Sequence, residues 1–334
     1  YRDRLSPPGH PFKPLNTPSI LYNDQPIALV VAESFEIARY AAGLVETEYK
    51  AEGFIATIDE NLSNPVWVKV MNAPSDRGNA DEVFELFPYQ VDATYVAPRH
   101  YANPMEPHAT TVIYEDDGDH FTIYDKIQGV GSSQGYIRRI FGLDQDQVRV
   151  ISEFVGGGFG TGLRPQYQLF MAMLAATELK RPAKVVMTRR QMFSFGHRPS
   201  AIQYMKLAAD ENGSLMSLSH KAYGETSTWE NYSEDVVTWS GMMYRCQNVK
   251  LEYEVIPVNA YTPIDTRAPG GTTGLFALEI AMDELACKAG FDPLEFRKIN
   301  YVTVDQNSDK PFSSKELMKC YDECARKFDW SKRK

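Results

Sequence analysis

Residues 148–162, VRVISEFVGGGFGTG, decide the fold of this chain. The β-branched start of the stretch predicts a strand, and the apolar run 165–179, which opens with Pro165, predicts a helix after the glycine-rich turn 156–162. A strand, a glycine-rich turn and a helix N-terminus together present backbone N–H groups to an anion. Five glycines in seven positions also add conformational entropy to the unfolded chain. We therefore interpret the turn as a ligand-binding loop, with a structural tight turn as the alternative.

Two familiar phosphate-binding loops do not fit this turn. A P-loop requires Lys and then Ser or Thr after the last glycine, whereas Gly162 is followed by Leu163 and Arg164. A dinucleotide-binding fingerprint requires GxGxxG near the start of a βαβ unit with an acidic ribose partner downstream, and no such register occurs. An oxidoreductase that binds a nicotinamide or flavin nucleotide is therefore only a third hypothesis.

Three other motifs carry candidate binding residues. Gln128 opens the glycine-rich turn 128–135, where its amide could donate to an oxo or phosphate oxygen. Arg267 lies in TRAPGGTTG, 266–274, where a guanidinium beside a helix entry suits an anionic ligand; an Arg paired with a surface carboxylate is the alternative. Glu106 and His108 lie two positions apart and would face the same side of a strand. They are either an acid–base pair or a satisfied buried pair.

The remaining patterns predict a mixed α/β fold. Near the N-terminus, the apolar run 26–32 predicts a buried strand and the spacing over 33–48 predicts a helix, which together form a βαβ-like unit. The polar segment 51–82 is a connection, with a domain boundary near residue 80. Further strands are expected over 91–97, 109–116, 120–126, 183–189 and 249–261, a hairpin around 211–213, and helices over 133–141, 275–290, 292–300 and 314–328.

Composition excludes several classes of protein. The 334 residues include 35 Lys and Arg against 44 Asp and Glu, a net charge of −9 that argues against broad contact with a nucleic-acid backbone. No apolar run approaches ~18 residues, so we expect no membrane-spanning helix. Neither end resembles a signal peptide or lipid anchor, which leaves a cytoplasmic and a periplasmic location open. The four cysteines have no zinc-ligand spacing; they are Cys246, Cys287, Cys320 and Cys324.

Several motifs, in this order, resemble the molybdenum-binding subunit of the xanthine dehydrogenase/aldehyde oxidase family, and most closely its bacterial aldehyde-oxidising branch. They are MEPHAT at 105–110, Gln128-Gly129, GGGFG at 156–160, TRAPGG at 266–271 and the segment 278–301. Residues 20–49 are similar to the family's small hammerhead domain. The resemblance implies a partial hammerhead α/β domain over 1–80, a first molybdopterin-binding domain over 81–300, and the truncated start of a second lobe over 301–334.

The family's members are molybdenum hydroxylases, which insert oxygen derived from water into an aldehyde or a heteroaromatic carbon. The resemblance implies molybdenum held through a molybdopterin, in the cytosine dinucleotide form, without a direct protein ligand. Gln128 matches the position that hydrogen-bonds the apical oxo ligand, and Arg267 matches an Arg at the substrate end of the pocket, so both are expected to be catalytic. The expected cofactor contacts are Gln128, Gly129, Gly157, Gly158, Phe159, Gly160 and Arg267.

The resemblance also suggests a substrate and partners. Leu163, Glu106 and His108 are the expected substrate-pocket residues, and Leu163 stands where purine-oxidising relatives carry Glu, which favours a less polar aldehyde. The family's catalytic Glu lies in a later lobe, and this chain begins at Tyr1 and ends as that lobe begins. We therefore expect a fragment or split part, inactive alone, that needs the missing lobe and partner subunits carrying 2Fe–2S clusters and FAD. A non-catalytic assembly paralogue is the alternative.

Overall fold

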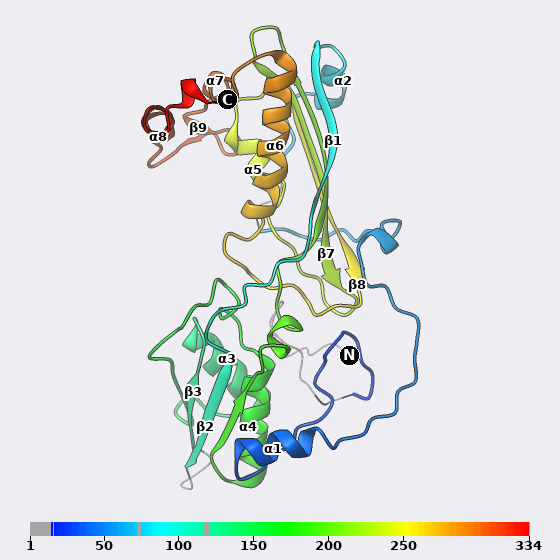
Figure 1. Cartoon of the computed structure of the whole chain (residues 1–334), viewed down its shortest axis with the longest axis vertical. Helices are drawn as coiled ribbons and strands as arrows, with labels where there is room; N and C mark the ends of the chain where they lie inside the picture. Colours follow the sequence, from blue (N-terminus) through cyan, green and yellow to red (C-terminus); the bar gives the residue numbers. More distant parts are fainter. Residues whose placement is uncertain (1–14, 16, 72–74, 116–119, 334) are drawn as a thin grey trace.

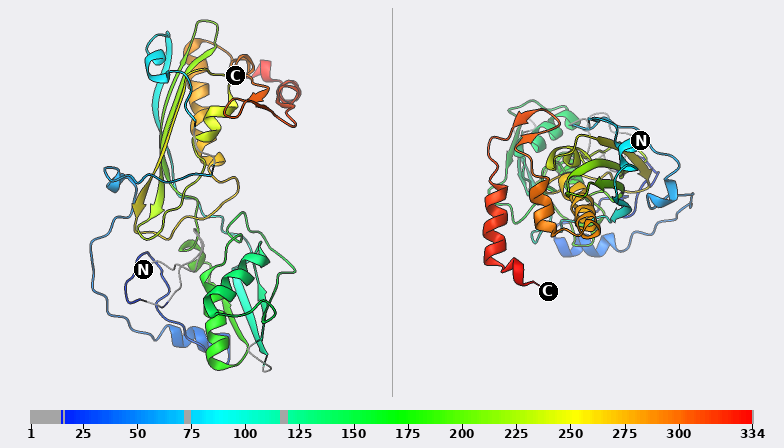
Figure 2. Two further views of the ribbon diagram at one scale, coloured as in Figure 1. Left: turned by 180° about the vertical axis from the view of Figure 1, so that it is seen from behind. Right: turned by 90° about the horizontal axis from the view of Figure 1, so that it is seen from above.

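The computed structural model describes residues 15, 17–71, 75–115 and 120–333. Two four-stranded sheets lie toward opposite ends of an elongated molecule, and each is covered by helices (Figure 1). The view from behind shows the same two bodies joined near the middle of the molecule (Figure 2). The mixed α/β class expected from the sequence is confirmed.

The first sheet has the strand order β1-β6-β7-β8. β6 is antiparallel to both β1 and β7, whereas β7 and β8 are parallel. The predicted hairpin around Asn212 and Gly213 is confirmed: Gly213 has φ +78°, and Asp210 Oδ1 accepts hydrogen bonds from the N–H groups of Asn212 and Ser214. The strands are β1 (Tyr89–Ala97), β6 (Ala201–Ala209), β7 (Leu215–Ser227) and β8 (Val249–Val258).

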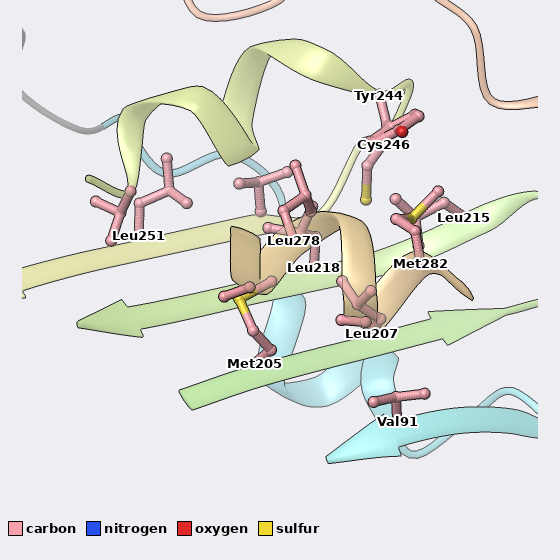
Figure 3. Close-up of a cluster of buried hydrophobic side chains, with 14 of the residues drawn as sticks. Val91, Met205, Leu207, Leu215, Leu218, Tyr244, Cys246, Leu251, Leu278 and Met282 are labelled. Carbon is pink, nitrogen blue, oxygen red and sulfur yellow. The ribbon is translucent and has the colours of Figure 1, made fainter. Parts of the chain in front are cut away.

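The long helix α6 (Gly271–Ala289) packs on this sheet and forms its core. Figure 3 shows Leu207 and Leu218 of the strands beside Leu278 and Met282 of the helix. All four side chains are fully buried, and each contributes about 1.5–3 kcal/mol by leaving water. Shorter helices flank this end of the molecule: α2 (Ala80–Phe84), α5 (Thr238–Met243) and α7 (Pro293–Ile299).

The second sheet has the order β4-β3-β2-β5, with β3 and β4 parallel and the other pairs antiparallel. Helix α4 is buried along most of its length because it is apolar on nearly every side. The helix and strands predicted around the glycine-rich turns are therefore present. Their bounds are β2 (Ala109–Glu115), β3 (His120–Asp125), α3 (Val130–Phe141), β4 (Val148–Ile151), α4 (Tyr167–Leu179) and β5 (Ala183–Val186).

This second sheet is inserted in the chain between β1 and β6. The chain leaves the first sheet and re-enters it at adjacent positions, since Ala97 is paired with Ala201 at the end of the β1–β6 ladder. A further isolated bridge joins His100 to Arg198. The two ends of the insertion thus run side by side.

The predicted strand over 26–32 is wrong. These residues form no strand, and several are exposed, because no other strand within the described ranges pairs with them. The helix predicted beside it is present but shorter, as α1 (Phe35–Ala42), and none of its residues is buried. The following segment extends to the first sheet, where Val66 exchanges backbone hydrogen bonds with Val255 of β8.

The remaining elements lie near the C-terminus and in the connections. Residues 301–333 form a small hairpin and the exposed helix α8, beside the α7 end of the first body (Figure 1). The domain boundaries near residues 80 and 300 stay predictions. Among the described helices, none is both long and apolar enough to cross a membrane. These remaining elements are β9 (Val304–Asp305), β10 (Lys310–Pro311), α8 (Leu317–Lys327) and the 3₁₀ turns η1 (Asp59–Asn61), η2 (Gln191–Phe193) and η3 (Trp330–Lys332).

Candidate cofactor-binding site

The glycine-rich loop between β4 and α4 adopts a backbone that most residues avoid. Gly157, Phe159 and Gly160 have φ values of +89°, +53° and +95°. A Cβ on Gly160 would lie 2.9 Å from the Cα of Thr266 and closer still to the carbonyl oxygen of Asp265. Only glycine therefore allows this loop to contact the segment before α6 so closely.

Three successive N–H groups of the loop are candidate donors to an anionic ligand. Within the described ranges, the N–H groups of Gly157, Gly158 and Phe159 have no hydrogen-bond acceptor. The next groups are used inside the loop, since Thr161 N–H donates to Gly158 O. Consecutive free N–H groups in a partly left-handed turn form a concave nest for a negatively charged ligand.

Gln128 is oriented by this loop. Its backbone N–H donates to Gly162 O at 2.6 Å. Its side-chain Oε1 accepts hydrogen bonds from the N–H groups of Gly160 and Gly162, both at 3.2 Å. Because an amide oxygen held by two N–H donors directs its NH₂ group to the opposite side, Nε2 is left as a donor, and it has no partner in the described part of the chain.

A buried carboxylate fixes the turn that carries Gln128. Asp125, at the end of β3, accepts hydrogen bonds from Thr110 Oγ1 at 2.6 Å and from Ser133 Oγ at 2.8 Å. Ser133 lies in the first turn of α3, so Asp125 ties the end of the strand to the start of the helix. Burial raises the pKa of Asp125, which these two hydrogen bonds partly offset.

Lys126 places a buried positive charge beside the glycine-rich loop. Its Nζ donates to Gly157 O at 2.6 Å. Burial lowers the pKa of Lys126, and the negative charges of Glu106 and Asp125 oppose that shift. A cation in this position favours a negatively charged ligand on the loop.

Arg267 is brought to the same loop from the other body. Its backbone N–H donates to Phe159 O at 2.8 Å, and its carbonyl oxygen accepts a hydrogen bond from Arg198. Arg164 and Asp265 add an ion pair between the two segments. The Arg267 side chain is exposed, and its guanidinium has no partner among the residues described. It is therefore free to bind an anionic ligand.

Glu106 and His108 do not form the acid–base pair considered above. Both lie just before β2 rather than within it. Glu106 Oε2 accepts a hydrogen bond from Gly156 N–H at 2.5 Å, and Glu106 N–H donates to Gly156 O. His108 is buried with its Nε2 3.3 Å from Gln166 Nε2. Burial, with the charges of Lys126 and Arg189, lowers the pKa of His108 to about 3, so its imidazole is neutral.

The other predicted residues lie at the edge of the loop. Leu163 is 44% exposed, and its N–H donates to Gly160 O. Phe159 is 51% exposed. Gly129 is the N-cap residue of α3, and a Cβ there would lie 3.2 Å from Leu163 O. The structure thus brings together Gln128, Gly129, the loop 157–160, Leu163 and Arg267. Glu106 is hydrogen-bonded to Gly156 at the start of the loop, and His108 is buried.

Sequence reasoning missed Lys126, Asp265 and Arg198. Lys126 had one available signal, because it is the last residue of the predicted strand 120–126 and lies two positions before Gln128. Asp265 and Arg198 carry no local pattern, since both act through contacts with distant parts of the chain. Within the described residues, no group of three or more His, Cys, Asp or Glu could hold a metal ion directly.

A separate groove of about 830 Å³ lies between the N-terminal segment and β5. It is lined mainly by apolar residues of 20–49 and 184–188, together with Tyr167 and Met171 of α4. None of the predicted site residues lines it. The candidate site is therefore formed by the glycine-rich loop, the turn at Gln128 and the segment at Arg267. This groove is not part of it.

Comparison with known proteins shows the family of this chain. Residues 64–301 match the family described as the molybdopterin cofactor-binding domain. The chain belongs to this family. It corresponds to part of a molybdenum-binding subunit of the xanthine dehydrogenase/aldehyde oxidase group. It is similar to the aldehyde oxidoreductase molybdenum-binding subunit PaoC of Escherichia coli, with 34% identity over 327 residues, 96% of this chain and 43% of PaoC.

Solved structures share the fold. The aldehyde oxidoreductase of Desulfovibrio gigas matches with a TM-score of 0.78 and 22% identity, over 94% of this chain and 38% of that one. Quinoline 2-oxidoreductase of Pseudomonas putida 86 matches with a TM-score of 0.79 and 20% identity, over 90% of this chain and 41% of that one. The chain thus spans less than half the length of these relatives.

Proposed function

We propose that this chain forms part of the cofactor-binding site of a molybdenum hydroxylase that oxidises aldehydes to carboxylates. One observation carries the proposal: three free N–H groups at 157–159 lie on the glycine-rich loop, and Gln128 and Arg267, which carry a free amide and a free guanidinium, are both hydrogen-bonded to that loop. Donors without protein acceptors, beside the buried Lys126, suit a large anionic group such as a molybdopterin.

The residues present fit such a cofactor, and each would make a different contact with it. The free N–H groups of Gly157, Gly158 and Phe159 would bind its anionic atoms, and Gln128 Nε2 would donate to an oxo ligand of the metal. Arg267 would bind an anionic group at the other side of the loop. When bound, the molybdopterin centre would supply the redox chemistry that adds oxygen derived from water to a carbonyl carbon.

The substrate proposed is an aldehyde of low polarity. The exposed side chains beside the site are apolar, since Leu163 and Phe159 are 44% and 51% exposed. Neither side chain offers a hydrogen bond to the ring nitrogens of a purine. The name of the PaoC relative, an aldehyde oxidoreductase subunit, supports the same substrate class.

The complete enzyme is proposed to need more than this chain. Partner subunits would carry 2Fe–2S clusters and FAD to remove electrons, and a further molybdenum-binding lobe would supply the general base, a Glu. The cofactor is proposed to be the cytosine dinucleotide form. The protein is proposed to act in the cytoplasm or the periplasm. The description of PaoC as a subunit supports an assembly of this kind.

Elemental analysis tests the proposal. We would measure molybdenum per chain in protein isolated from its own source with all co-purifying subunits, and assay aldehyde-dependent dye reduction with a purine as the control substrate. We expect about one molybdenum per chain and activity toward the aldehyde but not the purine. Absence of molybdenum would overturn the proposal in favour of an assembly role, and activity toward the purine alone would overturn the substrate class.

A further inference from the structure

We propose that Glu234 is a positioning residue that holds the segment 265–270 against the glycine-rich loop and thereby places Arg267. Glu234 is only 3% exposed. Its Oε2 accepts a hydrogen bond from Gly270 N–H at 2.8 Å, and its Oε1 accepts one from Tyr232 O–H at 3.0 Å. Gly270 is the residue at which the chain turns into α6, so this carboxyl group holds the entry of the helix.

The segment that Glu234 holds is linked to the glycine-rich loop. Tyr232 Oη lies 3.4 Å from Asp265 Oδ1, and Asp265 Oδ2 forms an ion pair with Arg164, directly after the loop. Arg198 adds a second link, because its guanidinium donates to the carbonyl oxygens of Arg267 and Ala268. Glu234 therefore holds the α6 end of the segment 265–270, while the ion pair of Asp265 and Arg164 joins the other end of the segment to the glycine-rich loop.

The segment has little freedom to adopt another arrangement. Gly270 has φ +71°, and a Cβ there would lie 2.5–2.7 Å from backbone atoms of Asp235. The Gly270 N–H group is consequently directed at Glu234 by backbone packing. If Glu234 were replaced by a residue without an acceptor, this buried N–H would be left unpaired, which is costly.

The protonation of Glu234 gives its role a measurable signature. Burial raises the pKa of Glu234 to about 7, and the hydrogen bond from Gly270, the charge of Arg198 and the hydrogen bond from Tyr232 offset part of this shift. Asp265 opposes ionisation, and Tyr253 of β8 also faces the carboxyl group. Because the pKa is raised when Glu234 is buried against Gly270, this arrangement of the segment 265–270 is favoured most below the ordinary Glu pKa, and the preference is progressively lost as pH rises through about 7.

Hydrogen exchange tests this role without depending on activity. We would measure protection factors for peptides spanning 265–272 between pH 5 and 8.5, normalised for the intrinsic exchange rate, in the protein as isolated. In the wild type, protection should fall by up to about tenfold per pH unit until about pH 7 and then level off. In Glu234→Gln, which keeps an acceptor for Gly270 but does not titrate, protection should be independent of pH.

Two further variants complete the test. Glu234→Ala should lose roughly fivefold or more of the protection at every pH, because Gly270 N–H has lost its acceptor. Glu279→Gln is the matched control, since Glu279 also accepts a hydrogen bond from a tyrosine, Tyr244, but lies away from the loops. It should keep the wild-type profile. Wild-type protection in Glu234→Ala would overturn the positioning role, and a pH-independent wild type or a Gln variant that still titrates would overturn the part assigned to the protonation of Glu234.

The consequence for the cofactor rests on the proposed function and is measured separately. Molybdenum content should fall in Glu234→Ala and be retained in Glu234→Gln. If the exchange results hold and the molybdenum content does not change, Glu234 positions the segment but Arg267 does not bind the cofactor. That outcome would overturn the proposed part of Arg267 and leave the positioning role intact.

Discussion

Single residues in the site act mainly through their backbones. Gly158 has no room for a Cβ because the Gln128 side chain fills the space, and Gly160 has none because the Asp265 carbonyl does. These glycines allow two segments from different bodies to share one surface, on which N–H groups and not side chains are the principal donors. The anion binding proposed for this loop would therefore depend on its conformation more than on its side-chain chemistry.

Gly160→Val tests this dependence. A β-branched residue at φ +95° is strained, and its side chain would separate the loop from Asp265 and Thr266. We expect the free energy of unfolding to fall by about 2 kcal/mol or more and the molybdenum content to fall with it. Urea unfolding and elemental analysis measure the two effects.

The control for this substitution is Gly131→Ala in α3. No atom lies within 4 Å of a Cβ at Gly131, so the variant should keep its molybdenum and gain up to about 1 kcal/mol in stability. If Gly160→Val retained wild-type stability and molybdenum, the loop would not be the cofactor seat.

The sequence predicts the parts of the site that lie in local motifs. The glycine-rich loop, Gln128 and Arg267 could be recognised because glycine runs next to helix entries are visible in a short window. Glu106 and His108 were predicted to share a strand face, but both precede β2, where the alternation of a strand does not hold. Glu234 and Asp265 were invisible, because each depends on partners far away in the sequence.

Elements with a clear hydrophobic period formed as the sequence predicted. Helix α6 and the hairpin of β6 and β7 each carry their own signal, an apolar stripe in one case and an Asn-Gly turn in the other. The run 26–32 is equally apolar but forms no strand, because a strand also needs a neighbour to pair with. Hydrophobic periodicity thus predicts whether a segment is a helix or a strand, but not whether a neighbouring strand is available to pair with it.

Leu278→Ala measures how much α6 contributes to the first body. Leu278 is fully buried against the sheet, so the substitution should lower the free energy of unfolding by about 2–5 kcal/mol. Leu86→Ala is the control, because Leu86 is 73% exposed and should change stability by about 0.5 kcal/mol or less. Urea unfolding compares them, and equal effects would mean that α6 is not part of the core.

The whole molecule contains a buried histidine that makes its stability depend on pH. His220 Nδ1 lies 2.8 Å from Ser240 Oγ and its Nε2 lies 3.1 Å from Gln203 Oε1. Burial lowers the pKa of His220 to about 3. The unfolded chain therefore binds a proton at mildly acidic pH that the folded protein rejects. Stability from this group is complete above the ordinary His pKa and is lost as pH falls toward 3.

Substitution of His220 separates this contribution from the others. Between pH 6 and 4, His220→Gln should have a dependence of unfolding free energy on pH that is shallower than the wild type by about 1.4 kcal/mol per pH unit. His100→Gln is the control because His100 is exposed, and it should keep the wild-type slope. The measurement is urea unfolding at several pH values, and identical slopes in all three proteins would contradict the assignment.

The pairing of Ala97 with Ala201 has a consequence for how such a molecule could arise. Residues 98–200 leave the first sheet and return to it at adjacent points, which is the geometry of a domain insertion. A chain segment with neighbouring ends can be gained by an ancestral sheet without breaking its ladder. The donors of the site come from the insertion, with Gln128 and the glycine-rich loop, and from its host, with Arg267. Neither part alone therefore carries the complete set of proposed donors.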